Sequence, residues 1–290
     1  MKKRLLAAVL LAVLMLFSAC KQESSPEDVL KLYYDSLEKG DYKQAYSCLS
    51  KDIKSDIKYE DYQEYFKFAR EKTDFVGYAP GTKHTTKDVK KGGKVKYKEA
   101  VVIPVEEKTK EKSEGAQVKT ASVERLLALE DGKHKLIWEV DVNRLLSQHY
   151  VGLAEELMKG QKPDYDKALE YIETAIKKDA QNPLAYYFRG AIMSQKDKAE
   201  EAIADIDKCI ELQEAELKLA EKAEPSQAVE AKKQQLSMML AYSYNAKGMT
   251  LAKNKQLDEA TACLKKALEY DPTNEFAKMG LERISGKKSK

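Results

Sequence analysis

The spacing of apolar residues changes three times along the chain. Positions 5–17 form an uninterrupted apolar run, whereas over 25–70 apolar residues recur every three or four positions. They alternate with polar residues over 95–141 and return to the helical period over 143–290. A period near 3.6 is typical of amphipathic helices, and a period of two is typical of half-buried strands. The pattern therefore predicts a leading apolar segment, then helices followed by a sheet, and then an all-helical region.

The leading segment has the layout of a secretion signal. Three basic residues, Lys2, Lys3 and Arg4, precede the apolar run, and the small residues Ser18 and Ala19 follow it. A basic start, a short apolar core and a small-residue cleavage site are typical of a signal peptide. About 13 apolar residues, at 1.5 Å each, are too few to cross roughly 30 Å of hydrocarbon. We therefore expect cleavage rather than a membrane span.

The end of this segment, L-F-S-A-C at positions 16–20, resembles the lipobox of bacterial lipoproteins, with Phe17 where Leu is usual. The resemblance implies that residues 1–19 are removed and that Cys20 is lipidated and becomes the mature N-terminus. Two or more acyl chains anchor a protein stably, so membrane attachment would need no spanning helix. The alternative is an ordinary signal peptide with an incidental cysteine.

The same resemblance implies a place in the cell envelope. Lys21 differs from the Asp that usually retains lipoproteins at the inner membrane, which implies the outer membrane in a cell with two membranes. Residues 20–24 would form a lipidated tether of less than roughly 20 Å, so the first domain would lie close to the lipid. A run of lysines would then form either a solvated sheet face or a contact with anionic headgroups. These lysines are Lys83, Lys87, Lys90, Lys91, Lys94, Lys96 and Lys98.

Helix signals follow the tether. Ser25 is a cap and Pro26 a first-turn residue, while Gly40 is typical of a helix end. Asp41 can cap a second helix, and a third apolar stripe with helical spacing runs over 59–70. The sequence therefore predicts three helices before the sheet.

Alternating residues predict an antiparallel meander after these helices. Asp131-Gly132 is a two-residue hairpin turn that precedes a last strand over 133–141. The residues expected on the apolar faces of the strands are Val95, Tyr97, Val101, Ile103, Val105, Val123, Arg125, Leu127, Leu129, Leu136, Trp138 and Val140. Helices followed by an antiparallel sheet predict an α+β domain over 25–142.

Positions 25–49, which contain P-E-D-V-L-K-L-Y-Y and G-D-Y-K-Q-A-Y, resemble the opening of small bacterial lipoprotein domains with the nuclear transport factor two-like, or cystatin-like, fold. The resemblance implies three helices across the concave side of a curled antiparallel sheet, where some members enclose a ligand pocket or active site. No residue matches a catalytic pattern of that fold. Small-ligand binding or enzymatic activity in this cavity is the alternative function, although tyrosines at helical spacing are more typical of a core.

An internal repeat marks the second region. Ala168 and Ala202 are 34 residues apart, and 58 residues separate Gly190 from Gly248. A 34-residue unit of two helices, with small residues where the helices cross, resembles the tetratricopeptide repeat. The longer spacing equals one repeat plus 24 residues, which predicts an insert over about 213–236.

The resemblance implies a tetratricopeptide-repeat solenoid over 143–290. It would contain three repeats, and the insert would lengthen two helices into a protruding hairpin. A final helix over 274–284 would cap the array, as terminal repeats require.

In this family the first helix of each repeat lines a concave groove that holds a peptide or a partner helix. The positions carried over are Val151, Glu155, Met158, Tyr187, Ala191, Ser194, Tyr242, Asn245 and Met249. They are mostly apolar or aromatic, which suits a hydrophobic peptide or helix. Some members clamp a terminal carboxylate with a set of Lys and Asn side chains. In this chain that set is absent, and only Asn245 stands in a suitable place. The alternative is a groove filled by the insert or by the N-terminal domain.

Composition excludes several function classes. The chain carries 51 Lys and Arg, three of them in the signal, so 48 remain against 48 Asp and Glu. This balance argues against a nucleic-acid binder. Cys48, Cys209 and Cys263 lack metal-site spacing, and no cofactor, metal or catalytic motif is present. The sequence therefore predicts no enzyme. It predicts a lipid-anchored envelope scaffold that binds a protein or peptide partner, and assembly of an envelope complex is one role that fits such a scaffold.

Overall fold

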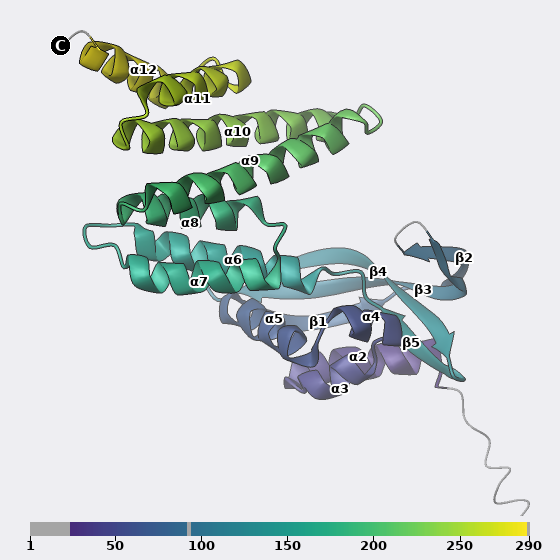
Figure 1. Ribbon diagram of the computed structural model, residues 1–290. Coiled ribbons are helices and arrows are strands. Elements are labelled where there is room, and N and C mark those ends of the chain that lie inside the picture. The colour runs from purple at the N-terminus through teal and green to yellow at the C-terminus, as the bar shows by residue number, and fades with distance from the viewer. Residues whose placement is uncertain (1–23, 92–93, 289–290) are drawn as a thin grey trace, which may run out of the picture. The chain divides into compact units, whose positions relative to one another are not determined.

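The computed structural model of the chain describes residues 24–91 and 94–288, and it divides into two compact units, Met1–Val142 and Asn143–Lys290. An antiparallel sheet with helices forms the first unit, and helices alone form the second (Figure 1). The predicted signal over 1–19, the lipidation site Cys20 and the neighbouring Lys21 lie outside the described residues. In the part of the chain that is described, no helix has the length and apolar character needed to cross a bilayer.

The first unit begins with helices whose ends follow the local signals. They are α2 (Pro26–Lys39), α3 (Tyr42–Ser47), α4 (Lys51–Asp56) and α5 (Tyr59–Lys72). The Ser25 hydroxyl accepts a hydrogen bond from the Asp28 backbone N–H at 3.1 Å, and Gly40 ends α2 with a φ of 74°. The prediction of three helices was wrong by one. Helix α4 has six residues and is capped by Ser50, and so short a helix shows no apolar period in the sequence.

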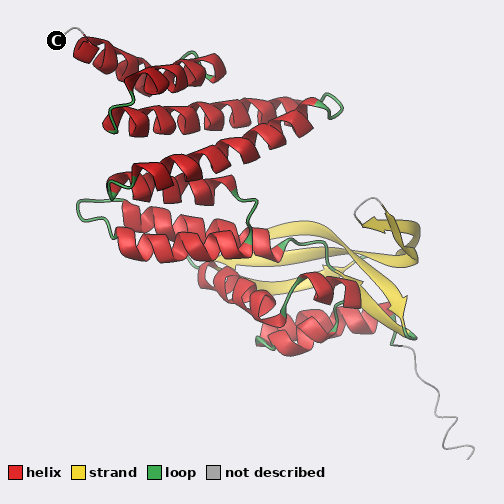
Figure 2. Cartoon of the chain, in the orientation of Figure 1, coloured by secondary structure: helices red, strands yellow, loops and turns green. Residues whose placement is uncertain are grey.

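Five strands form one antiparallel sheet among the described residues. They are β1 (Thr73–Pro80), β2 (His84–Lys91), β3 (Lys94–Glu111), β4 (Val118–Glu130) and β5 (Lys133–Ile137). The order is β1-β3-β4-β5, and β2 pairs with the other half of the long strand β3 (Figure 2). Asp131 and Gly132 both have positive φ, as the predicted two-residue turn requires.

Two residues predicted on apolar strand faces are exposed instead. Val95 is 48 % exposed and Leu129 is 54 % exposed. Val95 pairs only with Lys90, beyond the end of β4, and Leu129 pairs with His134 next to the hairpin turn. Alternation fixes the face of a residue but not how far along the strand that face stays covered. The middle of β3, with Ala100, Val102, Ile103 and Val105, is buried.

Aromatic side chains form much of the first core. Tyr62 is fully buried, and its ring centroid lies 5.4 Å from that of Trp138 in an edge-to-face contact. Phe66 stacks on the same indole with a centroid distance of 5.7 Å. On α2, Tyr34 stacks on Tyr78 at 4.3 Å. Figure 1 shows the helices of this unit gathered on one side of the sheet. The tyrosine stripes of α2 and α5 therefore bind these helices to the strands.

The second unit is a series of antiparallel helices (Figure 2). They are α6 (Val142–Met158), α7 (Tyr165–Lys178), α8 (Pro183–Gln195), α9 (Ala199–Glu221), α10 (Gln227–Lys253), α11 (Leu257–Tyr270) and α12 (Glu275–Lys288). Helices α9 and α10 have 23 and 27 residues and contain the 213–236 segment, apart from residues 222–226, which connect the two helices. The two arms of this segment contact each other, because Leu236 is buried and Lys232 pairs with Glu216 at 2.8 Å, whereas residues 221–228 at the tip are exposed.

Candidate partner-binding groove

Two glycines allow successive helices of the second unit to approach closely. A Cβ atom at Gly190 would lie 2.8 Å from Ile206, and a Cβ at Gly248 would lie 2.8 Å from Leu264. Both positions also face a backbone carbonyl, at 3.0 Å and 3.1 Å respectively. The same close contact thus occurs twice, between α8 and α9 and between α10 and α11. It fixes which faces of α8 and α10 remain free.

A hollow of about 670 Å³ lies between α8, α10 and α12, and we call it the larger hollow. It brings together three predicted groove residues from two helices, Ala191, Ser194 and Met249. The capping helix α12 adds Gly280, Arg283 and Ile284, and α9 and α11 add Ile206 and Leu257. Its other lining residues are Gln195, Ala246, Thr250, Ala252, Lys253 and Lys255.

A second space of about 500 Å³, the smaller hollow, lies further along α10. It contains the predicted residue Tyr242 together with Met238, Tyr270 and Phe276. Three of these side chains are exposed: Met238 by 46 %, Tyr242 by 42 % and Phe276 by 58 %. Large apolar side chains therefore meet solvent here.

The other predicted groove residues do not line either hollow. Val151 is buried in the core shared by α6, α7 and α8, so its assignment to the groove was wrong. Met158 packs against the same core, and Glu155 pairs with Lys159 at 3.2 Å. Tyr187 is half-buried, and burial raises the pKa of its hydroxyl. The predicted positions that line a hollow thus come from α8 and α10, and the binding role of these residues stays a prediction. Sequence spacing could not show which residues of α6 the core would bury.

Asn245 lies on α10 between Tyr242 and Met249. Its Oδ1 is buried and accepts no hydrogen bond from the described part of the chain. A buried acceptor without a donor costs about 1–3 kcal/mol, and a donor brought by a ligand would offset that cost.

Several residues of the two hollows were missed from the sequence. Met238 lies between the insert and the matched repeat, while Phe276 and Arg283 belong to the capping helix, and the repeat pattern assigns no groove positions in either place. One signal was available. Met238 precedes Tyr242 by four residues, so it continues the stripe formed by Tyr242, Asn245 and Met249.

The first unit contains its own cavity, of about 280 Å³. Its walls include Tyr33, Tyr34, Tyr65, Phe66, Phe75 and Trp138. Arg125 forms an ion pair with Glu107 at the wall and donates from Nε to the Tyr34 hydroxyl at 2.8 Å. The Tyr34 hydroxyl donates in turn to Glu107, and burial raises the pKa of both Tyr34 and Tyr65. The charges are thus paired with each other, and the tyrosines are held neutral.

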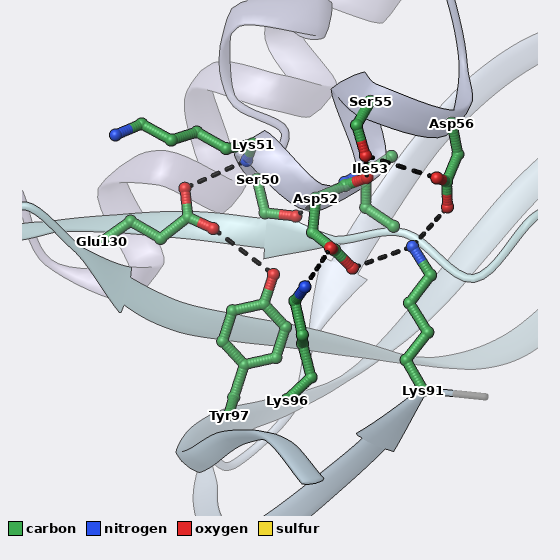
Figure 3. Close-up of polar contacts among 10 residues, drawn as sticks. All are labelled: Ser50, Lys51, Asp52, Ile53, Ser55, Asp56, Lys91, Lys96, Tyr97 and Glu130. Carbon is green, nitrogen blue, oxygen red and sulfur yellow. Dashed lines mark hydrogen bonds and ion pairs between the residues drawn. The ribbon is translucent and has the colours of Figure 1, made fainter. Parts of the chain in front are cut away.

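Part of the lysine run is engaged within the first unit. Lys91 pairs with Asp52 at 2.8 Å and also with Asp56, and Lys96 pairs with Asp52 at 2.7 Å (Figure 3). Lys83 pairs with Glu27 at 2.6 Å. Figure 3 shows the contacts of Lys91 and Lys96 joining α4 to the ends of β2 and β3, whereas Lys83 contacts α2. These lysines fasten the β2–β3 hairpin to a helix, which favours the solvated face over the headgroup contact.

The thiols of the described residues form no bond to each other. Cys48 and Cys209 are buried, and burial raises the pKa of Cys209 to about 11. Within the described ranges, no group of three or more His, Cys, Asp or Glu could hold a metal ion. The cysteines act as small core residues here.

Comparison with known families bears on the second unit. The family described as "Tetratricopeptide repeat" matches residues 184–216 and again residues 241–274. The C-terminal part of the chain contains tetratricopeptide repeats. The matched segments correspond to α8–α9 and α10–α11, where Gly190 and Gly248 make equivalent contacts. No protein in the curated set matches the chain.

Solved structures with similar helices are also known. The first TPR of Spaghetti (RPAP3) bound to the HSP90 peptide SRMEEVD is 18 % identical, covers 51 % of this chain and 96 % of that chain, and gives a TM-score of 0.40. The Arabidopsis OM64 TPR domain is 20 % identical. The match covers 50 % of this chain and 98 % of that domain, with a TM-score of 0.38. The first TPR domain of human RPAP3 is 19 % identical. The match covers 49 % of this chain and 91 % of that domain, with a TM-score of 0.38.

Proposed function

We propose that this protein is a lipid-anchored scaffold of the cell envelope and that its tetratricopeptide repeats bind a protein or peptide partner. The observation that carries the proposal is the larger hollow, where Ala191, Ser194 and Met249 from two repeats meet around open space. Its mostly apolar lining suits an apolar side chain of a peptide or helix. The role is binding rather than catalysis.

The insert does not occupy this groove. Its helical arms pack on each other, with Leu236 and Leu240 buried, while both hollows stay open beside them. This favours a groove open to a partner over one filled by the insert.

The anchor is the second part of the proposal. Cleavage after residue 19 would leave a lipidated Cys20 and a short tether, and Lys21 favours the outer membrane in a cell with two membranes. The N-terminal domain, which we propose has a cystatin-like fold, would lie close to the lipid. A partner bound by the repeats would thereby be concentrated at the membrane during assembly of an envelope complex.

Crosslinking in intact cells tests the groove. The variant is Tyr242→Ala/Met249→Ala, since both side chains are exposed, whereas Tyr187 is half-buried and its loss would also test folding. The control is Leu219→Ala, which removes a side chain that is 70 % exposed and lies outside both hollows. We expect a defined partner with the wild type and the control and at least fivefold less with the double variant, about 1 kcal/mol in binding. Equal recovery from all three proteins would contradict the groove.

A second function is favoured by the aromatic cavity of the first unit. At about 280 Å³ it would hold a small, largely apolar ligand beside the paired Arg125 and Glu107. Trp138 is the single tryptophan of the chain and lines this cavity, so its fluorescence reports occupancy. Titration with benzoate, phenol and cyclohexanol should change that fluorescence, and Ala69→Phe, which fills the cavity, should abolish the change. A response that survives Ala69→Phe would rule this cavity out as its origin.

A further inference from the structure

The two hollows belong to one groove. Met238, Tyr242, Asn245 and Met249 are spaced by four, three and four residues, so they share one face of α10 over about 16 Å. Both hollows lie on this face, the smaller beside Met238 and Tyr242 and the larger beside Met249. Helix α12 forms the opposite wall of both, with Phe276 in one and Gly280 and Arg283 in the other. We call this feature the α10–α12 groove.

The groove presents large apolar side chains among polar ones at the end of a repeat array. The smaller hollow also contains Asp271 and Glu275, but Glu275 pairs with Lys278 at 2.7 Å and Asp271 accepts hydrogen bonds from Thr273. Terminal repeats need a polar outer surface for solubility. Here Phe276 on the last helix is 58 % exposed and lines the same hollow as Met238 and Tyr242, which are 46 % and 42 % exposed. Contiguous apolar surface of this kind marks an interaction site. Met238 lies on α10 between the 213–236 insert and the matched repeat at 241–274, so the binding surface extends beyond the repeat itself.

One end of the groove is basic. The larger hollow is lined by Lys253, Lys255 and Arg283 and by no carboxylate. Lys253 is engaged with Asp197 at 2.6 Å and with the Ser194 carbonyl at 2.7 Å. Lys255 and Arg283 form no ion pair with any described residue. Two cations are therefore available beside an apolar floor.

We propose that the α10–α12 groove binds an amphipathic α-helix of the partner protein, with an apolar stripe against the groove walls and acidic residues beside Lys255 and Arg283. This inference rests on the proposed function and names the chemistry of the partner. A helix fits because the groove walls are themselves two helices, and about 16 Å matches three turns of a third. The unpaired cations select carboxylates by charge complementarity.

Matched synthetic peptides test this proposal on the full mature chain in detergent. Three fluorescein-labelled helices of 15 residues share one leucine stripe and carry Glu, Gln or Lys at every polar position. Fluorescence anisotropy should give a Kd for the Glu peptide about tenfold below that of the Lys peptide at low salt. The difference should shrink at about 0.2 M NaCl, because salt screens exposed charges.

Two pairs of variants locate the interaction. Lys255→Glu/Arg283→Glu should reverse the preference between the Glu and Lys peptides, whereas Lys222→Glu/Lys265→Glu makes the same charge change outside both hollows and should leave it unchanged. Met238→Ala/Phe276→Ala should raise the Kd of all three peptides by the same factor, and Leu219→Ala should leave each Kd unchanged. A preference that Lys255→Glu/Arg283→Glu leaves intact would place the selectivity elsewhere and overturn the proposal.

The outcomes separate this inference from the proposed function. Equal Kd values for all three peptides would keep the groove as a protein-binding site but overturn the acidic character of the partner. A lower Kd for the Lys peptide than for the Glu peptide would overturn it as well. Failure of every peptide to bind would overturn the helix-binding groove, and the cellular crosslinking experiment would then decide the proposed function independently.

Discussion

At the scale of single residues, the repeats depend on positions where no side chain fits. Gly190 and Gly248 sit where a Cβ would come within 2.8 Å of a neighbouring core side chain and about 3 Å of a backbone oxygen. A side chain can move aside, but a helix backbone moves only by separating the two helices. These two glycines therefore set the spacing of the helix pairs that form the groove.

The first prediction concerns Gly248→Ala. The added methyl would press on Leu264 and on the Ala260 carbonyl, so we expect a loss of about 1–3 kcal/mol in the free energy of unfolding. Gly152→Ala in α6 is the control, since no described atom lies within 4 Å of its added Cβ. That change should stabilise by about 0.5–1 kcal/mol, because alanine suits a helix interior better than glycine. Urea unfolding followed by circular dichroism measures both, and equal effects would refute the crossing argument.

At the scale of elements, the sequence predicts helices and turns well where local signals act. Ser25, Gly40 and Asp131-Gly132 mark a helix start, a helix end and a hairpin, and each holds in the structure. The long pattern of small residues also predicts the repeats. Helix α4 escapes prediction because six residues show no period, and Val95 is exposed because its strand runs past the neighbouring strand.

The groove is predictable only in part for a related reason. Ala191, Ser194 and Met249 follow from repeat positions, because the repeat fixes which face of each first helix is free. Arg283 and Phe276 come from the capping helix, and their place beside α10 depends on tertiary packing that no local pattern encodes.

The second prediction separates the two faces of α10. Leu236 is 4 % exposed and packs inward, whereas Met238, two residues later, is 46 % exposed. Leu236→Ala should lower the free energy of unfolding by about 2–5 kcal/mol through lost burial and a cavity. Met238→Ala should change it by no more than about 0.5 kcal/mol and should instead weaken peptide binding. Denaturation and anisotropy on both variants check this, and an equal loss of stability would show that Met238 is also a core residue.

The third prediction concerns the contact between α4 and the β2–β3 hairpin. The hydrogen bond and charge of Lys91, and then those of Lys96, lower the pKa of Asp52 below its usual value of about 4. A carboxyl whose pKa is lower in the folded state stabilises the fold above its unfolded pKa, and this contribution is lost as the pH falls through the folded pKa. Asp52→Asn should therefore remove part of the stability at pH 6 and flatten its decline between about pH 5 and 3.

Urea unfolding across this pH range measures the effect. Asp88→Asn, in the same hairpin, makes an equal charge change outside the ion-pair cluster and should keep the wild-type decline. Parallel curves for the wild type and Asp52→Asn would show that the cluster does not act through this carboxyl.

At the scale of the whole molecule, the two units divide the work that we propose. The repeats of Asn143–Lys290 supply a groove, and the first unit follows the segment that we propose is lipidated at Cys20. Such an arrangement raises the concentration of a bound partner at the membrane without any new contact, because binding becomes confined to a thin layer. The anchor should then matter for encounters in the cell and not for the chemistry of the groove.

The fourth prediction follows from this division. Cys20→Ser removes the atom that would carry the lipid, so the protein should move from the membrane fraction to the soluble fraction on cell fractionation. Each buried CH₂ of an acyl chain contributes about 0.8 kcal/mol, so the loss of two or more chains leaves no comparable hold on the bilayer. Purified Cys20→Ser protein should bind the Glu peptide with an unchanged Kd, while partner crosslinking in cells should fall. Retention of Cys20→Ser in the membrane fraction would mean that another segment, or a bound partner, holds the protein there.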